Sequence, residues 1–183
     1  MILSLFKRNA AETAGEALYA AIVEQARTPK FYAEWGVPDT TMGRFEMVAL
    51  HAFLVIRRLS AGDRAAKKVS QNLLDAMFRN LDHTLRELGV GDLSVAKKMR
   101  NLAENFYGRS AAYEDALKED DDGKLQEALM RNVYTGMPPT HAPQLTSYVR
   151  ALDRALGGQP LERLASGIVQ FAQGEGEALK EAP

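Results

Sequence analysis

The sequence predicts an all-α fold, a single-domain bundle of about six to seven helices around a central apolar helix at residues 40–60. Apolar residues recur at three- and four-residue spacing along nearly the whole chain, which is the period of a helix rather than of a strand. Gly and Pro residues punctuate this pattern where one helix would end and the next begin. The length of 183 residues, with 46% hydrophobic and 26% charged residues, fits one globular domain of ordinary size.

The first helix is predicted to begin at Thr13, because Thr13 and Glu16 have the spacing of a capping box. Pro29 ends it, since the residue before a proline is pushed out of helical geometry. Residues 1–12 are then a flexible or membrane-touching N-terminus, in which the first six residues either fray, dock on the core or contact a membrane surface.

The segment 29–39 connects the first two helices and is rich in aromatic residues, namely Phe31, Tyr32 and Trp35. Side chains this apolar must dock onto something. We expect them to plug one end of the core; an exposed patch that binds a partner is the alternative.

The bounds of the next three helices are predicted from their capping residues and from apolar residues at helical spacing. Residues 40–60 form a helix with Asp39 or Thr40 as N-cap, and it is apolar nearly all round, which places it at the centre of the bundle. A helix over 63–88 ends at Gly89 in a Schellman-type turn with Val90 as the apolar contact. A short link then leads to a helix over 94–118, whose interior Gly108 suggests close helix packing or a kink.

Three shorter helices complete the domain. The acidic run 119–122 precedes a helix over 124–134 and favours its N-terminus electrostatically. Thr140 is predicted to cap a helix closed by Gly157 and Gly158, and Pro160 to open a last helix that reaches Phe171. Residues 13–173 thus form one domain, and residues 174–183 a flexible tail.

Most kinds of catalytic site lack their signature here. The chain has no cysteine, and its three histidines are far apart without HExxH or Glu-x-x-His spacing, so we predict no metal and no cofactor. There is no phosphate-binding glycine loop and no GxSxG elbow, and we predict that the protein is not an enzyme. The net charge of −1 argues against a duplex nucleic-acid partner.

The chain has no predicted transmembrane segment. The longest uncharged apolar run, residues 47–56, is far shorter than the roughly 20 residues that a bilayer requires. The N-terminus also lacks the order of charges of a secretory signal. We expect a cytoplasmic protein.

Charge is unevenly distributed along the chain. Residues 57–68 carry five basic side chains against Asp63, and a second basic group follows in the 94–118 helix: Arg57, Arg58, Arg64, Lys67, Lys68, then Lys97, Lys98 and Arg100. The run 119–122 is wholly acidic. The basic groups are either solvated helix faces or patches that meet an anionic surface such as RNA, lipid or an acidic partner.

Blocks of sequence from residue 31 to 117 resemble the ubiquinol–cytochrome c chaperone family. They include Phe-Tyr-Ala-Glu-Trp-Gly-Val-Pro at 31–38, Gly-Arg-Phe-Glu at 43–46, Arg-Glu-Leu-Gly-Val-Gly-Asp-Leu at 86–93 and Phe-Tyr-Gly-Arg at 106–109. The length and the absence of a presequence resemble the bacterial branch. The resemblance implies a chaperone that binds newly made cytochrome b and assists assembly of the cytochrome bc1 complex, and mitochondrial relatives work with a partner protein at the ribosome.

A holder for an immature membrane protein needs exposed apolar or aromatic surface beside basic groups. Candidate client-binding residues are therefore Phe31, Tyr32, Trp35, Arg44, His51, Arg57, Arg58, Lys67, Lys68, Lys97, Lys98, Tyr107, Arg109 and Tyr113. Within this set, Arg44, His51, Arg109 and Tyr113 are predicted to form one polar cluster that either locks the bundle or lines a groove. The alternatives are a small-molecule-binding bundle, with Met47, His51 and Tyr107 as haem ligands to test, and a ribosome-surface adaptor.

Overall fold

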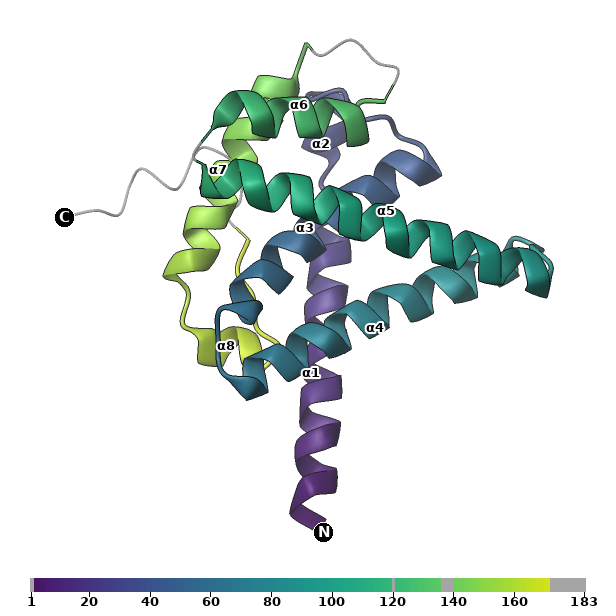
Figure 1. The fold of residues 1–183 in the computed structure, drawn as a ribbon, viewed down its shortest axis with the longest axis vertical. Helices are drawn as coiled ribbons and strands as arrows, with labels where there is room; N and C mark the ends of the chain where they lie inside the picture. The colour runs from purple at the N-terminus through teal and green to yellow at the C-terminus, as the bar shows by residue number, and fades with distance from the viewer. Residues whose placement is uncertain (1, 120, 136–139, 172–183) are drawn as a thin grey trace.

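The computed structural model describes residues 2–119, 121–135 and 140–171, with side chains from Ala10 onward (Figure 1). Within these ranges all regular secondary structure is helical, which confirms the predicted fold class. The helices are α1 (Ile2–Ala26), α2 (Pro29–Ala33), α3 (Thr41–Ser60), α4 (Arg64–Glu87), α5 (Asp92–Lys118), α6 (Asp122–Asn132), α7 (Ala142–Gly158) and α8 (Leu161–Ala165).

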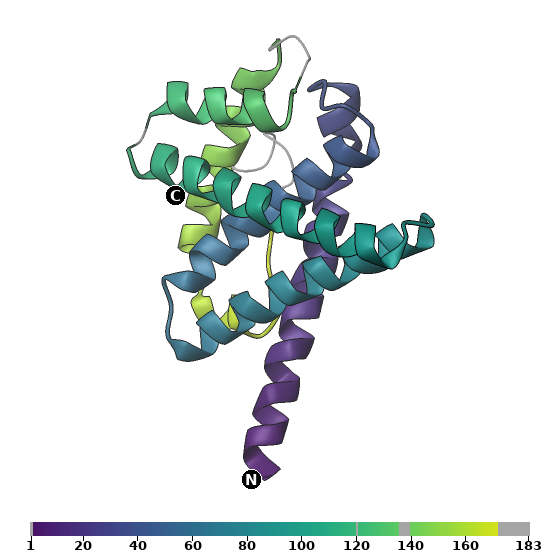
Figure 2. The ribbon, with the colours of Figure 1, turned by 45° about the vertical axis from the view of Figure 1, so that its right-hand side comes forward.

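Helix α3 is the centre of the bundle, as its apolar composition predicts. It contacts α1, α4, α5, α7 and α8, and its side chains from Met47 to Val55 are almost all buried. Figures 1 and 2 show α1 and α4 crossing on one side of α3, while α7 lies on another side and α6 closes one end. Because five helices pack on α3, most of its surface is buried, which explains why its residues are apolar on nearly every side.

Several helix ends lie where their caps predict. The Thr40 side chain accepts a hydrogen bond from Gly43 N at 3.1 Å, and Asp63 accepts one from Ala66 N at 2.9 Å. At the other end of α4, Gly89 has a φ of 77°, and Val90 N donates to Leu85 O at 3.1 Å. Both features belong to the predicted Schellman ending.

Helix α1 begins well before the predicted start at Thr13. It runs from Ile2, so the Thr13–Glu16 pair lies inside the helix and caps nothing. The first turns of α1 project away from the bundle in both views (Figures 1 and 2). A membrane contact for residues 1–12 stays a prediction, and the predicted tail at 174–183 lies outside the described residues.

Two predictions near the C-terminus are wrong. Helix α7 follows His141 rather than a Thr140 cap, and α8 ends at Ala165 instead of reaching Phe171. Gly167 explains the second difference, because its φ of 90° breaks the helix and a Cβ there would meet the Ala14 backbone at 3.0 Å. The chain therefore passes close to α1 at Gly167, and residues 168–171 are not helical.

Helices α4 and α5 form a hairpin whose distal end extends beyond the rest of the bundle (Figures 1 and 2). The short link predicted between them places the two helices side by side. In the described part of the chain, no helix combines the length and the apolar character needed to cross a membrane.

Candidate functional site

The aromatic connector is a plug. Phe31 and Trp35 are buried, and both rings lie against Tyr148, at 5.1 and 5.6 Å between centroids. Tyr134 donates a hydrogen bond to Trp35 O at 2.9 Å, which fixes the end of the connector. Phe31 lies on α2 and Trp35 in the turn that follows it, and the two rings contact each other at 5.4 Å between centroids. The plug interpretation is confirmed, and the interpretation of these two residues as an exposed patch is wrong.

Tyr32 and Arg44 lie at the rim of this plug. The Tyr32 hydroxyl donates to Ala26 O at 2.5 Å, and the Arg44 guanidinium lies 5.9 Å from the Tyr32 ring centre. Arg44 also pairs with Asp39 at 2.6 Å, a hydrogen bond that lowers the pKa of that carboxyl. Tyr32, Arg44 and Asp39 line an open pocket of about 410 Å³ together with Arg27. Both Arg44 and Asp39 are exposed, so this pair contributes little to stability.

His51 is fully buried and makes hydrogen bonds at both ring nitrogens. Its Nδ1 lies 2.7 Å from Met47 O and its Nε2 2.7 Å from the Tyr148 hydroxyl, which in turn accepts from Gln25 at 3.1 Å. Burial lowers the pKa of His51 to about 4, so the ring is neutral, donating from Nδ1 and accepting at Nε2. This chain of hydrogen bonds ties α1, α3 and α7 together.

Arg109 pairs with a carboxylate that the sequence interpretation did not include. Its Nη2 lies 2.8 Å from Glu46, whose side chain is only 3% exposed. Burial raises the pKa of Glu46 to about 7, against the opposing effect of Arg109. Tyr113 lies one turn further along α5, buried with its ring 5.7 Å from Phe53. Burial also raises the pKa of Tyr113.

The predicted polar cluster of four residues is therefore wrong. Arg44 sits at the rim of the connector, His51 faces α7, and only Arg109 and Tyr113 share a site, on the face of α3 that meets α5. Glu46 lies about 140° around α3 from His51, because successive helical residues are rotated by about 100°. The separate sites join helices to one another, which is the structural role expected of buried polar groups.

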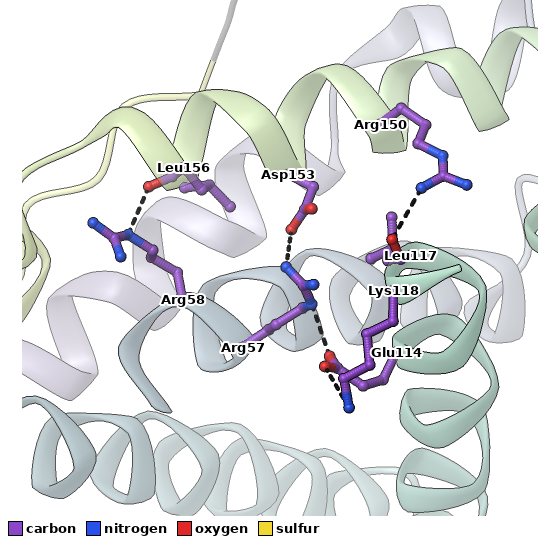
Figure 3. Close-up of polar contacts among 8 residues, drawn as sticks. All are labelled: Arg57, Arg58, Glu114, Leu117, Lys118, Arg150, Asp153 and Leu156. Carbon is purple, nitrogen blue, oxygen red and sulfur yellow. Dashed lines mark hydrogen bonds and ion pairs between the residues drawn. The ribbon is translucent and has the colours of Figure 1, made fainter. Parts of the chain in front are cut away.

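Two arginines of the predicted basic patch also point into the bundle. Arg57 donates to Glu114 and to Asp153, each at 2.7 Å, and so joins α3 to both α5 and α7 (Figure 3). Arg58 donates to Leu156 O in the last turn of α7 at 2.9 Å and to O of the C-cap residue Gln159 at 2.8 Å. The interpretation of these two side chains as an exposed patch is wrong.

Arg150 is a third such arginine, and sequence reasoning missed it. Its side chain is 9% exposed; it donates to Leu117 O, shown in Figure 3, and to Ala116 O, and it pairs with Asp122 at 2.8 Å. Arg150 thereby fastens α7 to the junction of α5 and α6. The available signal was an arginine beside Val149 on the apolar stripe of its helix.

The remaining basic candidates are on the surface. Lys67 and Lys68 are exposed on the first turns of α4, together with Arg64. Lys97 and Lys98 are exposed on the first turns of α5, together with Arg100. None of these six side chains pairs with an acidic group among the residues that the structure describes. They form two separate cationic groups, at opposite ends of α4.

Exposed apolar side chains gather on the α4–α5 hairpin. Leu88 is 68% exposed, Leu93 92% and Tyr107 58%, which makes three of the five large hydrophobic residues that are exposed in the described part of the chain. Gly108 follows Tyr107, and a Cβ there would meet nothing within 4 Å. The expectation that close packing within the chain explains Gly108 is wrong. The α4–α5 hairpin thus combines exposed apolar residues with cations that have no acidic partner in the described chain.

The proposed haem ligands do not come together. Met47 is fully buried in α3, the ring nitrogens of His51 are both engaged, and Tyr107 is on the outer face of α5. Within the described residues, no group of three or more acidic or histidine side chains could hold a metal ion.

Comparisons with known proteins agree on one family. The model of the ubiquinol–cytochrome c chaperone family matches residues 33–171. A crystal structure described as the Cbp3 homolog from Brucella abortus is 40% identical, with a TM-score of 0.85, and the match covers 94% of this chain and 97% of that one.

Curated animal proteins are more distant relatives. The ubiquinol-cytochrome-c reductase complex assembly factor 1 of Xenopus laevis is 25% identical over 73% of this chain and 67% of its own length. The mouse and human factors of the same name are each 26% identical over 73% of this chain. This chain spans 45% of the length of each of those two proteins.

Proposed function

This chain belongs to the ubiquinol–cytochrome c chaperone family, and we propose that its client is newly made cytochrome b. In this proposal it holds cytochrome b at the cytoplasmic face of the inner membrane until that subunit joins the cytochrome bc1 complex, ubiquinol–cytochrome c reductase. The observation that carries the proposal is the family match over residues 33–171, which begins at the end of α2 and includes α3 to α8 in full.

The surface of the molecule supports a binding role. A polytopic membrane protein exposes apolar helices before assembly, so a holder needs apolar surface of its own that remains accessible. Tyr107, 58% exposed on the outer face of α5, offers such surface. The buried polar groups have a structural role instead. His51, Arg57 and Arg109 each join α3 to a neighbouring helix, and so they stabilise the bundle that carries this surface.

A deletion strain tests the client. We expect its membranes to lose the bc1 cytochromes in a redox difference spectrum, and a plasmid copy of the gene to restore them. Cytochromes of other respiratory complexes serve as the internal control. In addition, a tagged chain should co-isolate pulse-labelled cytochrome b from wild-type cells. Undiminished bc1 cytochromes in the deletion strain would contradict the proposal.

A further inference from the structure

The turn at the end of the α4–α5 hairpin presents two leucines to solvent. Leu88 and Leu93 lie on either side of it and are the two most exposed large hydrophobic residues in the described chain, at 68% and 92%. The turn is ordered by hydrogen bonds from Gly89 N to Arg86 O at 2.9 Å and from Val90 N to Leu85 O at 3.1 Å. Figures 1 and 2 show this end projecting from the bundle. The leucines therefore sit on a fixed convex tip.

Three unpaired cations lie directly behind that tip. Lys97, Lys98 and Arg100 are exposed on α5 and pair with no acidic group in the described chain. They follow Leu93 by four to seven residues, which corresponds to roughly 6–11 Å along the helix axis. Apolar side chains thus lie outermost, with positive charges one to two turns inward.

The acidic residues near the tip are paired within the hairpin. Arg86 pairs with Asp82 at 2.6 Å and also with Asp92, and Glu87 lies 3.4 Å from His83. The Arg86 guanidinium contacts both aspartates, so each of these carboxylates has a partner on the hairpin. The next acidic residue along α5 is Glu104. Lys97, Lys98 and Arg100 are thus the basic side chains near the tip that contact no acidic side chain in the described chain.

This arrangement fits an anionic bilayer better than a loop of a membrane-protein client. Interfacial segments bury apolar groups about 5–10 Å into the boundary between headgroups and acyl chains and place Lys and Arg at the headgroups. Cytoplasmic loops of membrane proteins carry an excess of Lys and Arg, so they have the same sign as this cluster. Anionic headgroups have the opposite sign.

We propose that the distal α4–α5 hairpin docks this protein on an anionic membrane surface. Leu88 and Leu93 enter the headgroup region, and Lys97, Lys98 and Arg100 bind lipid phosphates. The inference rests on the proposed function in that a cytochrome b holder works at the bilayer. It assigns the membrane contact to the hairpin, whereas the sequence suggested the first six residues.

Sedimentation of the full chain with vesicles tests the docking. The probes are vesicles of phosphatidylcholine with and without phosphatidylglycerol, at low and high salt. We expect the protein to bind the anionic vesicles only, and less at high salt. Each surface cation contributes roughly a fivefold factor, so the triple change Lys97→Gln, Lys98→Gln and Arg100→Gln should weaken binding about 100-fold. The pair Leu88→Ser and Leu93→Ser should weaken it more than about tenfold.

A matched control removes the same number of charges from the first turns of α4, at the other end of the hairpin. The triple change Arg64→Gln, Lys67→Gln and Lys68→Gln should leave binding close to that of the wild type. The pair Leu5→Ser and Phe6→Ser tests the N-terminal alternative and should also leave it close to wild type. Circular dichroism confirms that each variant folds, since all the changed described side chains are exposed.

Three outcomes overturn the docking proposal: no binding of the wild type to anionic vesicles, equal losses in the two triple variants, or a loss confined to the N-terminal pair. A fourth is a hairpin variant that binds vesicles normally but fails to restore bc1 cytochromes in the deletion strain, which would make the hairpin a protein-binding surface. The deletion strain itself judges the cytochrome b proposal, and the vesicle result stands independently of it.

Discussion

The interior of the bundle and the distal α4–α5 hairpin use similar basic side chains for different purposes. In the interior, Arg57, Arg58 and Arg150 donate to carboxylates and to helix-terminal carbonyls of other helices. On the hairpin, Lys97, Lys98 and Arg100 contact no acidic partner in the described chain. A positive charge in a sequence is therefore not evidence for a binding surface until its possible partners within the fold are known.

Among the basic side chains of the two regions, we expect substitution of Arg150 to lower the free energy of unfolding most. Arg150→Met keeps an aliphatic side chain of similar length but removes the donor to the carbonyls of Ala116 and Leu117. Because buried carbonyls that lose a donor are costly, we expect the free energy of unfolding to fall by about 3 kcal/mol. Urea denaturation measures it. The matched exposed change, Arg100→Met, should alter stability by less than about 0.5 kcal/mol; equal losses would remove the distinction between the two regions.

Substitution of Arg57 should lower the free energy of unfolding by less than substitution of Arg150. Arg57→Met leaves Glu114 and Asp153 without their shared guanidinium, and all three side chains are 22–30% exposed. A buried ion pair that loses one partner costs about 3–5 kcal/mol, and partial exposure reduces this to about 2 kcal/mol.

A double-mutant cycle shows whether that loss comes from the ion pair. Asp153→Asn alone and together with Arg57→Met should reveal a coupling of about 1 kcal/mol by urea denaturation. Lys118, which pairs with the same Glu114 but is 63% exposed, provides the comparison, since Lys118→Met should cost less than about 0.5 kcal/mol. Strict additivity of the Arg57 and Asp153 changes would show that the contact contributes nothing to stability.

The buried groups of α3 should also make stability depend on pH, with opposite signs. The pKa of Glu46 rises from 4.5 to about 7, so the folded protein holds the extra proton between these values and stability falls as pH rises. The pKa of His51 falls from 6.5 to about 4, so the folded protein holds fewer protons there and stability increases as pH rises. Between pH 4.5 and 6.5 the two effects oppose each other.

Single substitutions separate these two effects. In Glu46→Gln, stability measured by urea denaturation should increase between pH 4 and 6.5, with a slope of at most about 1.4 kcal/mol per pH unit. In His51→Gln it should fall between pH 4.5 and 7. The wild type should change less than either variant over the shared range. The same pH profile in all three proteins would contradict this assignment.

Much of the fold follows from local pattern. The caps at Thr40 and Asp63 and the glycine ending of α4 are local contacts, in which a residue bonds to a neighbour three to five positions away. Such contacts can be read from spacing. The end of α8 could not, because close packing of Gly167 against Ala14 involves residues distant in the sequence.

The candidate site was harder to predict than the fold. Arg44 and His51 lie seven residues apart on one side of α3, yet Arg44 reaches Asp39 in the connector, and His51 reaches Tyr148 in α7. Their partners depend on which helix packs on each face, and periodicity does not contain that information. The exposure of Leu88 was missed for the same reason, since an apolar residue in a helix pattern normally predicts burial.

The two glycines Gly108 and Gly15 extend the comparison to the backbone. At Gly108 a Cβ meets nothing within 4 Å, so Gly108→Ala removes the entropic cost of a helical glycine without a clash. We expect the free energy of unfolding to rise by about 1 kcal/mol, measured by urea denaturation. At Gly15, where α1 crosses α4, a Cβ would lie 2.7 Å from backbone atoms of Asn72 and Leu73, so Gly15→Ala should destabilise the protein. A loss of stability in Gly108→Ala would mean that the outer face of α5 is packed against another part of this chain, and would argue against a free hairpin surface.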